Sequence, residues 1–352
     1  MSVRVAVIGC GVIAPTHASA LSAIKDAQIT WACDLIEDRA RALAERFDIP
    51  NVTTEAIEAI AADNVDAVTI CTDHASHAEL AIAAMNAGKH VLCEKALAAS
   101  DDQLDAMLQR HREVGNGLAF AGIFQHRFNP VYQLTRKYVR DGMFGKILTG
   151  EARVLCERTN EYYHADSWRG TWEGEGGSVL INQAIHTIDI LAWMLDGVQS
   201  VSATYSNRTH GGTIETEDTA VAAVTFDDGA LGTINATCSS HLHWEPAVSI
   251  HGSDGSVKIY DGHLQRASFR DPSMESQFMA DLEEMENTTF HAEGKSYYGG
   301  HHGSQIEDFV SAVRDRRPPF VTAASARHAV DVVLGIYRSH QSGQWTSIGS
   351  RP

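Results

Sequence analysis

Three polar side chains share one stripe of an otherwise apolar stretch, and one of them is a histidine. His186 and Asp189 follow Asn182 by four and seven residues. The apolar pattern of 180–195 predicts a helix, and in a helix this spacing puts the three on one face. A histidine there, just after the glycine-rich segment 174–177, is suited to proton transfer near neutral pH. A core histidine satisfied by a neighbour would give the same local pattern.

A second candidate for chemistry is the pair Glu94-Lys95, which directly follows the short apolar run 90–93. If that run is a strand of a parallel sheet, Lys95 lies at its carboxyl end, where open α/β sheets bind ligands. The lysine charge would stabilise negative charge that develops on a substrate oxygen. Glu-Lys pairs are also common on protein surfaces, so the position after a strand is what favours a catalytic role.

The turn at 9–14, Gly-Cys-Gly-Val-Ile-Ala, indicates which ligand such a sheet would bind. It follows the apolar run 3–8 and leads into Pro15, a residue suited to a first helical turn. A strand that breaks into G-x-G-x-x-A and then a helix is typical of a dinucleotide cradle. The glycines allow the tight turn and the approach of the pyrophosphate. Asp34, about 20 residues further on, would hold a ribose 2′-hydroxyl.

Two further groups of residues are candidates for contacts with a cofactor or a substrate. The first follows the apolar run 67–71 and should edge the cofactor site, although Thr72 and Asp73 would equally suit helix capping. Its members are Thr72, Asp73, His74 and His77. The second precedes the histidine-bearing helix and could form a lid over a sugar or a nicotinamide, or a lid without ligand contact. Its members are Tyr163, Trp168, Arg169 and Trp172.

The remaining histidines raise the question of a metal site. They occur as the pairs His241/His243 and His301/His302. No carboxylate or cysteine spacing completes a ligand set around them, so we expect no metal. His302 stays a candidate for bordering the substrate.

The elements that must position these residues fall into two groups. Strands are expected in the first third of the chain at 3–8, 29–33, 67–71, 90–93 and 118–123. Helices are expected between them at 37–47, 55–61, 77–87 and 101–114. Several strands are apolar on both faces, as parallel strands covered by helices must be. We therefore predict an α/β fold whose first domain, residues 1–123, is a doubly wound (Rossmann) parallel sheet that binds a dinucleotide.

Residues 124–352 predict a second domain of the α+β type, for substrate binding and oligomerisation, with an open, mostly antiparallel sheet. Strands are expected at 147–156, 198–206, 219–226, 230–238, 247–251 and 256–260, with a hairpin turn at 227–229. Helices are expected at 180–195, 305–314 and 324–339. The segment 268–295 is polar and irregular, which predicts a long loop.

The strands 220–226 and 230–238 carry apolar or small residues on both faces. One layer of helices can cover only one face, and a solvated face should be more polar. We therefore expect a homodimer or homotetramer joined through the open face of this sheet. The alternative is that the loop 268–295 folds back over that face.

The composition excludes several classes of partner. The chain has 352 residues and a formal net charge of −17, with a sequence pI of about 5.4, which argues against nucleic acids and anionic membranes. No apolar run is long enough to span a bilayer. A strand at the very start leaves no room for a signal peptide. The six cysteines form no C-x-x-C motif, which favours reduced thiols and a cytoplasmic location.

Together, the motifs resemble those of the glucose–fructose oxidoreductase/inositol dehydrogenase (Gfo/Idh/MocA) family over nearly the whole chain. The resemblance rests on G-C-G-V-I-A (9–14), C-T-D-H-A-S-H (71–77), C-E-K (93–95), F-Q-H-R-F-N-P (124–130), W-R-G-T-W-E-G-E-G-G (168–177), N-Q-A-I-H-T-I-D (182–189) and Q-I-E-D-F (305–309). It implies a nicotinamide domain, an open-faced α/β domain, and hydride transfer to or from a sugar, a cyclitol or a sugar derivative.

By position, the resemblance implies Lys95 and His186 as the catalytic pair, with Asn182 on the substrate side. With the candidates above, the expected substrate contacts are Lys95, Tyr163, Asn182, His186 and His302. The expected cofactor contacts are Gly9, Gly11, Val12, Ile13, Asp34, Arg39, Thr72, His74, His77, Glu94, Lys95, Gln125, Trp168 and Arg169.

Two positions depart from the family pattern: Ala96 stands where proline is usual, and Asn182 where many members have aspartate. An amide cannot accept a proton from His186, although it can still form a hydrogen bond to it.

These observations predict an NAD-dependent dehydrogenase that acts on the CH–OH group of a sugar or sugar derivative. Asp34 would repel the 2′-phosphate of NADP, and Arg39 is the one cation close by in the sequence, so NAD is the expected cofactor. Two alternatives remain open. One is an NAD-dependent glycoside hydrolase that works through transient oxidation. The other is a sensor that binds a dinucleotide without turnover, against which the presence of both Lys95 and His186 speaks.

Overall fold

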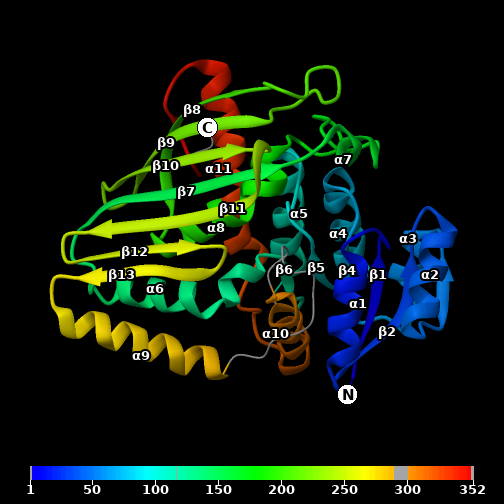
Figure 1. Cartoon of the computed structure of the whole chain (residues 1–352). Coiled ribbons are helices and arrows are strands. Elements are labelled where there is room, and N and C mark those ends of the chain that lie inside the picture. The colour runs from blue at the N-terminus through cyan, green and yellow to red at the C-terminus, as the bar shows by residue number, and fades with distance from the viewer. Residues whose placement is uncertain (1, 116, 289–299, 350–352) are drawn as a thin grey trace. The chain divides into compact units, whose positions relative to one another are not determined.

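The computed structural model describes residues 2–115, 117–288 and 300–349 (Figure 1). These residues form two compact units. One contains the chain up to residue 125 together with 300–327, and the other contains 126–288 and 328–349. Each unit is built around its own sheet.

The first unit contains a six-stranded sheet in the order β3-β2-β1-β4-β5-β6, and all neighbouring strands are parallel. Its strands are β1 (Val3–Ile8), β2 (Ala27–Cys33), β3 (Asn51–Thr53), β4 (Ala67–Ile70), β5 (His90–Cys93) and β6 (Phe120–Gly122). Its helices include α1 (Ala14–Ala23), α2 (Glu37–Phe47), α3 (Ala56–Ala61), α4 (His77–Asn86) and α5 (Asp101–Val114). This order confirms the predicted doubly wound sheet.

The order of this sheet puts its switch point between β1 and β4, because the chain turns back there to build the other half. Residues of β4 and β5 are buried on both faces, except for the half-buried His90 at the start of β5. The glycine turn follows β1, and Lys95 follows β5. Both therefore lie at the carboxyl edge of the sheet.

A helix from late in the chain completes the core of the first unit. In α10 (His302–Asp315), Ile306, Phe309 and Val310 are buried in the same cluster as β1 and α1. Gln305 accepts a hydrogen bond from Phe124 N at 3.0 Å and donates one to Gly122 O at 2.7 Å, next to the end of β6. We predicted this helix in the second domain, and a single boundary after residue 123 does not describe its packing.

The second unit contains an eight-stranded sheet in the order β13-β12-β11-β7-β10-β9-β8-β14. Its strands are β7 (Ile147–Glu157), β8 (Val198–Ser206), β9 (Thr219–Phe226), β10 (Leu231–Thr237), β11 (Ser239–Gly252), β12 (Gly255–Tyr260), β13 (His263–Phe269) and β14 (Thr346–Ser347). β7 and β10 are parallel, and the other neighbouring pairs are antiparallel. The predicted hairpin joins β9 to β10, with Gly229 at a φ of 83°.

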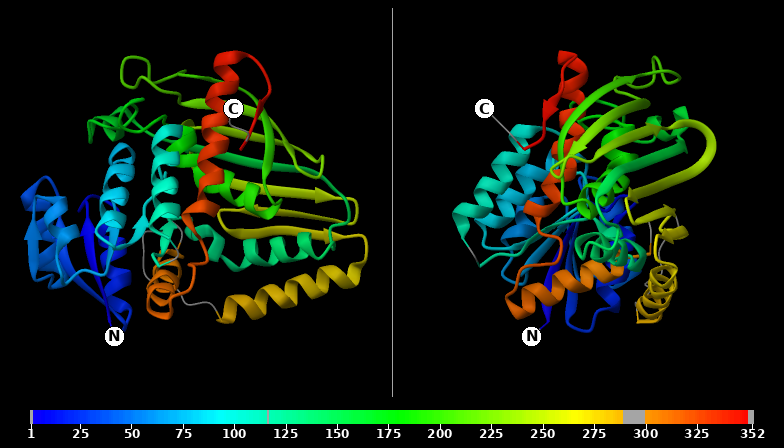
Figure 2. Two further views of the ribbon diagram at one scale, coloured as in Figure 1. Left: turned by 180° about the vertical axis from the view of Figure 1, so that it is seen from behind. Right: turned by 90° about the vertical axis from the view of Figure 1, so that its left-hand side faces the viewer.

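Helices cover one face of this sheet (Figures 1 and 2). The elements of the unit are α6 (Pro130–Arg140), α7 (Asn160–His164), a π-helical segment at Val179–Ala184, α8 (Ile185–Met194), α9 (Pro272–Thr288) and most of α11 (Ala323–Ser342). Along β9 the residues alternate: Ala222 and Val224 are buried, whereas Val221 and Ala223 are exposed. The second face of the sheet therefore carries exposed apolar side chains.

The segment 268–295, predicted as a long loop, is in large part regular structure, so that prediction was wrong. β13 ends at Phe269, and Pro272 then starts α9, a position that suits proline. Phe278 and Leu282 are buried one turn apart among many acidic residues, and Phe278 packs against Tyr138 of α6. The helix contacts α6 and β13, so it does not cover the open face. Residues 289–295 lie outside the described part of the chain.

Within the described residues, no helix combines the length and the apolar character that crossing a membrane requires.

Candidate active site

The glycine turn after β1 has the shape that close approach of a ligand requires. Gly9 has a φ of 87°, and a Cβ there would lie 2.7 Å from the carbonyl carbon of Cys71. Only glycine fits this position without displacing backbone. At Gly11 the corresponding position is open, so the backbone faces free space. The turn therefore fits the pyrophosphate cradle of a dinucleotide.

The carboxylate of Asp34 holds this turn in place. It accepts a hydrogen bond from Cys10 N at 2.8 Å and another from Ile36 N at 2.8 Å. The side chains around it are open to solvent, since Val12 and Ile36 are exposed and Leu35 is 91% exposed. An ionised carboxylate has about four acceptor positions, so two backbone donors leave capacity for a ribose hydroxyl.

The loop after β4 presents the second predicted group. Asp73 accepts a hydrogen bond from Ser76 N at 3.2 Å and caps a short 3-10 turn, as capping predicts. Thr72 Oγ1 accepts one from Ser76 Oγ at 2.8 Å. His74 is buried, and His77 is fully buried, with Nδ1 2.7 Å from Ala96 O and Nε2 3.2 Å from Thr72 O. Burial lowers the pKa of His77, so the ring is neutral.

Glu94 forms the centre of a buried polar cluster beneath Lys95. Its Oε2 accepts a hydrogen bond from Lys95 N at 3.0 Å, and its Oε1 accepts one from His17 Nε2 at 2.9 Å. The Nε2 of His302 lies 3.8 Å from the same Oε1. Burial would raise the pKa of Glu94, but the hydrogen bond and charge of His17, with the charges of His302 and Lys95, lower it to about 2. The carboxylate is therefore ionised and holds the backbone from which Lys95 projects.

The ligand-type atoms of His17, Glu94 and His302 all lie within 4.8 Å of one another. This group was not predicted, because His17 stands on α1, far along the chain from the other two residues. The 2.9 Å separation between His17 Nε2 and Glu94 Oε1 is a hydrogen-bond length. The 2.8 Å contact of His17 Nδ1 with Thr69 Oγ1 occupies the other ring nitrogen.

The peptide bond between Lys95 and Ala96 is cis. The backbone on either side of this bond is held by two contacts: Glu94 Oε2 accepts a hydrogen bond from Lys95 N at 3.0 Å, and His77 Nδ1 lies 2.7 Å from Ala96 O. Lys95 itself is half-buried.

His186 and Asn182 lie on a helical segment with an unusual start. Asn182 belongs to the π-helical stretch 179–184, and His186 belongs to the first turn of α8. Turns of π-helix are rare and occur frequently at functional sites. Both side chains are half-buried, and the His186 ring lies edge-on to His126, with ring centroids 5.2 Å apart. Asp189, the third residue of the stripe, is buried in a bidentate ion pair with Arg127, at 2.8 and 2.5 Å.

Two buried carboxylates support this segment, and the sequence analysis assigned a role to neither. Glu175 accepts hydrogen bonds from Asn182 Nδ2 and, at 2.5 Å, from Gly170 N. Glu217 accepts hydrogen bonds from Ser178 N at 3.2 Å and from Leu180 N at 3.0 Å. The Tyr337 hydroxyl donates to Glu217 Oε1 at 3.0 Å. Glu217 thus caps the amino end of the segment that carries Asn182 and His186.

The Glu217 carboxyl predicts a specific dependence of stability on pH. Burial raises its pKa from 4.5 to about 7, although its hydrogen bonds act in the opposite direction. Between these values the folded protein binds more protons than the unfolded chain. The free energy of unfolding therefore falls as pH rises, by about 3 kcal/mol for this group. Glu217→Gln should remove that contribution. Urea unfolding of both proteins at about pH 5 and about pH 8 measures it, and identical pH responses would contradict the assignment.

The predicted aromatic lid divides into a core residue and a surface cluster. Tyr163 is buried, and its hydroxyl lies 2.8 Å from Ser178 Oγ and 3.1 Å from Cys238 Sγ. Arg169 stacks on Trp168 and Tyr162, 4.6 and 4.5 Å from the ring centroids, and is hydrogen-bonded to Asp166 at 3.1 Å. The contacts of Tyr163 are those of a structural residue, while Trp168 and Arg169 are half-buried.

The comparisons with known proteins agree with this architecture. Residues 3–121 match the family model "Oxidoreductase family, NAD-binding Rossmann fold", and residues 136–348 match "Oxidoreductase family, C-terminal alpha/beta domain". The chain belongs to the Gfo/Idh/MocA oxidoreductase family.

Several of the relatives are dehydrogenases of inositols or sugars by name. The chain is 29% identical to myo-inositol 2-dehydrogenase of Thermotoga maritima, over 72% of this chain and 74% of that protein. It is 28% identical to D-glucoside 3-dehydrogenase of Escherichia coli, over 74% and 78% of the two chains. The WlbA dehydrogenase of Bordetella pertussis, solved with NADH and UDP-GlcNAcA, is 26% identical, covers 99% of each chain and superimposes with a TM-score of 0.88.

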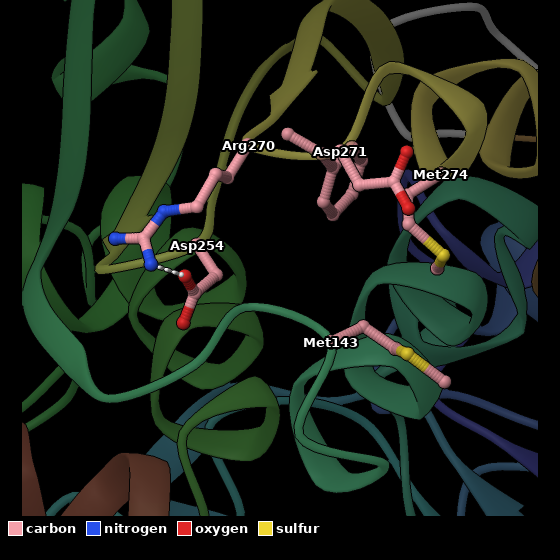
Figure 3. Close-up of a pocket in the computed structure, with 6 residues that line it drawn as sticks. Met143, Asp254, Arg270, Asp271 and Met274 are labelled. Atoms are coloured by element: carbon pink, nitrogen blue, oxygen red, sulfur yellow. Dashed lines mark ion pairs between the residues drawn. The ribbon is translucent and has the colours of Figure 1, made fainter.

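The remaining predicted contacts of this Gfo/Idh/MocA member are placed as follows. Gln125 is buried at the end of the first unit, and Arg39 is exposed on α2. His302 is buried beside Glu94 rather than open to solvent. A surface pocket of the second unit is lined by other residues: Met143, Asp254, Phe269, Arg270, Asp271 and Met274. There Arg270 pairs with Asp254 at 2.7 Å (Figure 3), and none of the six is a predicted site residue.

Proposed function

We propose that this protein is an NAD-dependent dehydrogenase that oxidises a CH–OH group of a sugar, a cyclitol or a sugar derivative. The observation that carries the proposal is the support of Lys95. It follows a strand at the carboxyl edge of the dinucleotide-type sheet, and the ionised Glu94 carboxylate holds its backbone nitrogen. Binding of a cofactor and a substrate at that edge is the rule for open α/β sheets.

Bound NAD would supply the hydride acceptor, and the residues that fit it are Gly9, Gly11 and Asp34. Lys95 binds the substrate oxygen and stabilises the negative charge that it gains. His186 takes the hydroxyl proton as the carbon–hydrogen bond breaks. Asn182 accepts a hydrogen bond from the substrate.

The remaining contacts complete the proposal. Thr72, His74, His77, Glu94, Gln125, Trp168 and Arg169 would surround the cofactor with Val12, Ile13 and Arg39. We infer that His17, Glu94 and His302 act as a hydrogen-bonded group rather than as a metal site, because two of them already share a hydrogen bond. The six buried, unpaired cysteines suit the reducing cytoplasm.

A screen for turnover tests the proposal. The protein is mixed with NAD and one candidate substrate at a time, taken from a panel of sugars, cyclitols and nucleotide sugars. The formation of reduced nicotinamide is followed by its absorbance. Steady formation of NADH with a member of this panel is expected. Tight binding of NAD without reduction by any of them would favour a sensor instead.

Asp34 predicts a preference for NAD over NADP. A 2′-phosphate next to this fixed carboxylate would suffer a repulsion of about 1–4 kcal/mol, equivalent to binding that is weaker by about fivefold to several hundredfold. Titration of both cofactors by calorimetry measures the ratio. Asp34→Ser should reduce it, whereas Asp38→Ser, an exposed acidic residue on α2, should leave it unchanged. Equal binding of NADP by the unaltered protein would contradict the prediction.

We further propose that a second copy of the chain covers the open face of the second sheet. Val221, Leu231 and Leu148 are 46%, 62% and 51% exposed on neighbouring strands, so a monomer would present an apolar patch to water. Closed symmetry through a self-complementary patch is the common solution, giving a dimer or a tetramer.

Light scattering at micromolar concentration tests the assembly, and a monomer would rule it out. The burial pattern decides which residue to change, because Val224 faces the core and Thr225 the other side. Thr225→Asp and Val221→Asp should reduce the molecular mass, since each places a charge in an apolar interface. Thr225→Val, which adds no charge, is the control. An unchanged mass in both Asp variants would place the interface elsewhere.

A further inference from the structure

The carboxylate of Glu175 has no assigned task in the proposed reaction, yet it touches a residue that does. It lies in the loop before the π-helical segment and is fully buried. Its Oε1 accepts a hydrogen bond from Asn182 Nδ2, and its Oε2 accepts one from Gly170 N at 2.5 Å. Burial lowers the pKa of Arg169, but the charges of Tyr162, Asp166 and, to a smaller extent, Glu175 raise it overall, as does the hydrogen bond to Asp166. A buried carboxylate in such surroundings is held in one place by its donors.

This contact determines which way the amide of Asn182 points. The hydrogen bond runs from Asn182 Nδ2 to a carboxylate oxygen of Glu175, so the amide turns its NH2 group toward that carboxylate. The amide oxygen then points away from Glu175, on the other side of the Cβ–Cγ bond. Without this neighbour, a half-turn about one bond would exchange the two ends. Asn182 therefore offers an acceptor, and not a donor, to anything bound on that side.

We propose that Glu175 is a positioning residue that fixes Asn182 as a hydrogen-bond acceptor and so selects substrates with a free hydroxyl beside the reacting carbon. The proposal rests on the dehydrogenase function above. Asn182 stands four residues before His186, so the hydroxyl that it binds neighbours the one that His186 deprotonates. Polyols with vicinal hydroxyl groups satisfy this requirement, whereas deoxy or O-methyl analogues cannot donate at that position.

A charge exchange between the two positions tests the proposal. In Glu175→Gln the new side chain can donate as well as accept a hydrogen bond, so the amide of Asn182 is no longer held in one orientation. N182D brings two carboxylates into direct contact. Each single variant should lower kcat/KM roughly tenfold or more, largely through KM, with NAD affinity retained. In the double variant E175Q/N182D the glutamine donates to the new aspartate, which keeps an outward acceptor. Its kcat/KM should return to within about threefold of the unaltered enzyme.

Two controls separate positioning from folding. Glu173→Gln removes an exposed carboxylate from the same loop and should change nothing. Thermal unfolding should show N182D destabilised and the double variant restored. Recovery of stability without recovery of kcat/KM would reduce Glu175 to a structural role and overturn the proposal. If the losses in kcat/KM of the two single variants simply multiply in the double variant, the proposal is overturned as well.

Substrate analogues give a second readout that a structural role would not move. The unaltered enzyme should strongly prefer the vicinal diol over its deoxy analogue, and Glu175→Gln should narrow that preference roughly tenfold. An unchanged preference would contradict the proposal. If the unaltered protein oxidises no member of the panel, the dehydrogenase function itself fails. If the unaltered protein turns over normally but the double variant E175Q/N182D does not recover kcat/KM, only the proposed role of Glu175 fails.

Discussion

Lys95→Ala should lower kcat by about 10²–10⁴-fold, the largest loss expected from a single substitution in this protein. The lysine charge would stabilise the alkoxide that forms as hydride leaves, and no water molecule can replace a fixed positive charge at that point. NAD affinity should remain nearly intact, because Gly9, Gly11 and Asp34 form the cradle independently of the side chain. Stopped-flow and steady-state kinetics on the best substrate measure the loss.

The control for loss of charge is Lys25→Ala, which removes an exposed lysine from the same unit. It should leave kcat unchanged. Lys95→Arg keeps the charge but replaces a compact ammonium by a planar group, so it should recover only part of the rate. Turnover of Lys95→Ala close to that of the unaltered enzyme would remove the lysine from the mechanism.

His186→Ala should be the second most damaging substitution, with a loss of the same order, about 10²–10⁴-fold. Its distinguishing feature is the pH profile. Without the proton acceptor, the reaction depends on hydroxide or on a substrate that has already lost its proton, so part of the rate should return at high pH. The activity of the unaltered enzyme should instead level off, because histidine is deprotonated above neutral pH.

His164→Ala, which removes an exposed histidine from the same unit, controls for loss of an imidazole. It should leave the pH profile as it is. If His186→Ala loses activity equally at every pH, the residue holds the substrate but transfers no proton. Asn182→Ala should act less strongly and mainly on KM.

The sequence predicted the framework well where local chemistry leaves few choices. β1, β5, α2 and α5 have the predicted bounds, because buried apolar runs and, for α5, a side-chain cap are strong local signals. Ser100 caps α5, with its hydroxyl accepting a hydrogen bond from Gln103 N at 3.4 Å. The three-residue strand β3 was missed, since so short a run carries little pattern.

The errors arose where tertiary packing decides. α9 is rich in acidic residues, and a few large side chains along it give too little apolar pattern to predict a helix. Its burial against α6 and β13 supplies the stability that the pattern does not show. α6 was not predicted either, although Asn129 caps it and Pro130 starts it, both recognisable signals.

The candidate site was only partly predictable for a similar reason. The types and spacing of residues suggested Lys95, Asn182 and His186. The carboxylates and the histidine that support them come from other parts of the chain. His17 could have been found from its place among the apolar residues of α1, a position that buries it and therefore requires a partner. Glu175 carries no such signal, because a glutamate in a glycine-rich loop ordinarily faces water.

Isotope transfer tests the central claim most directly. A substrate from the screen is prepared with deuterium on the carbon to be oxidised and incubated with the unaltered enzyme and NAD. Hydride transfer predicts NADH that carries this deuterium on the nicotinamide ring, in equal amount to the ketone formed, and a slower rate than with ordinary substrate. Product that forms without net NADH, as in hydrolysis through transient oxidation, or NADH that contains no deuterium, would contradict it.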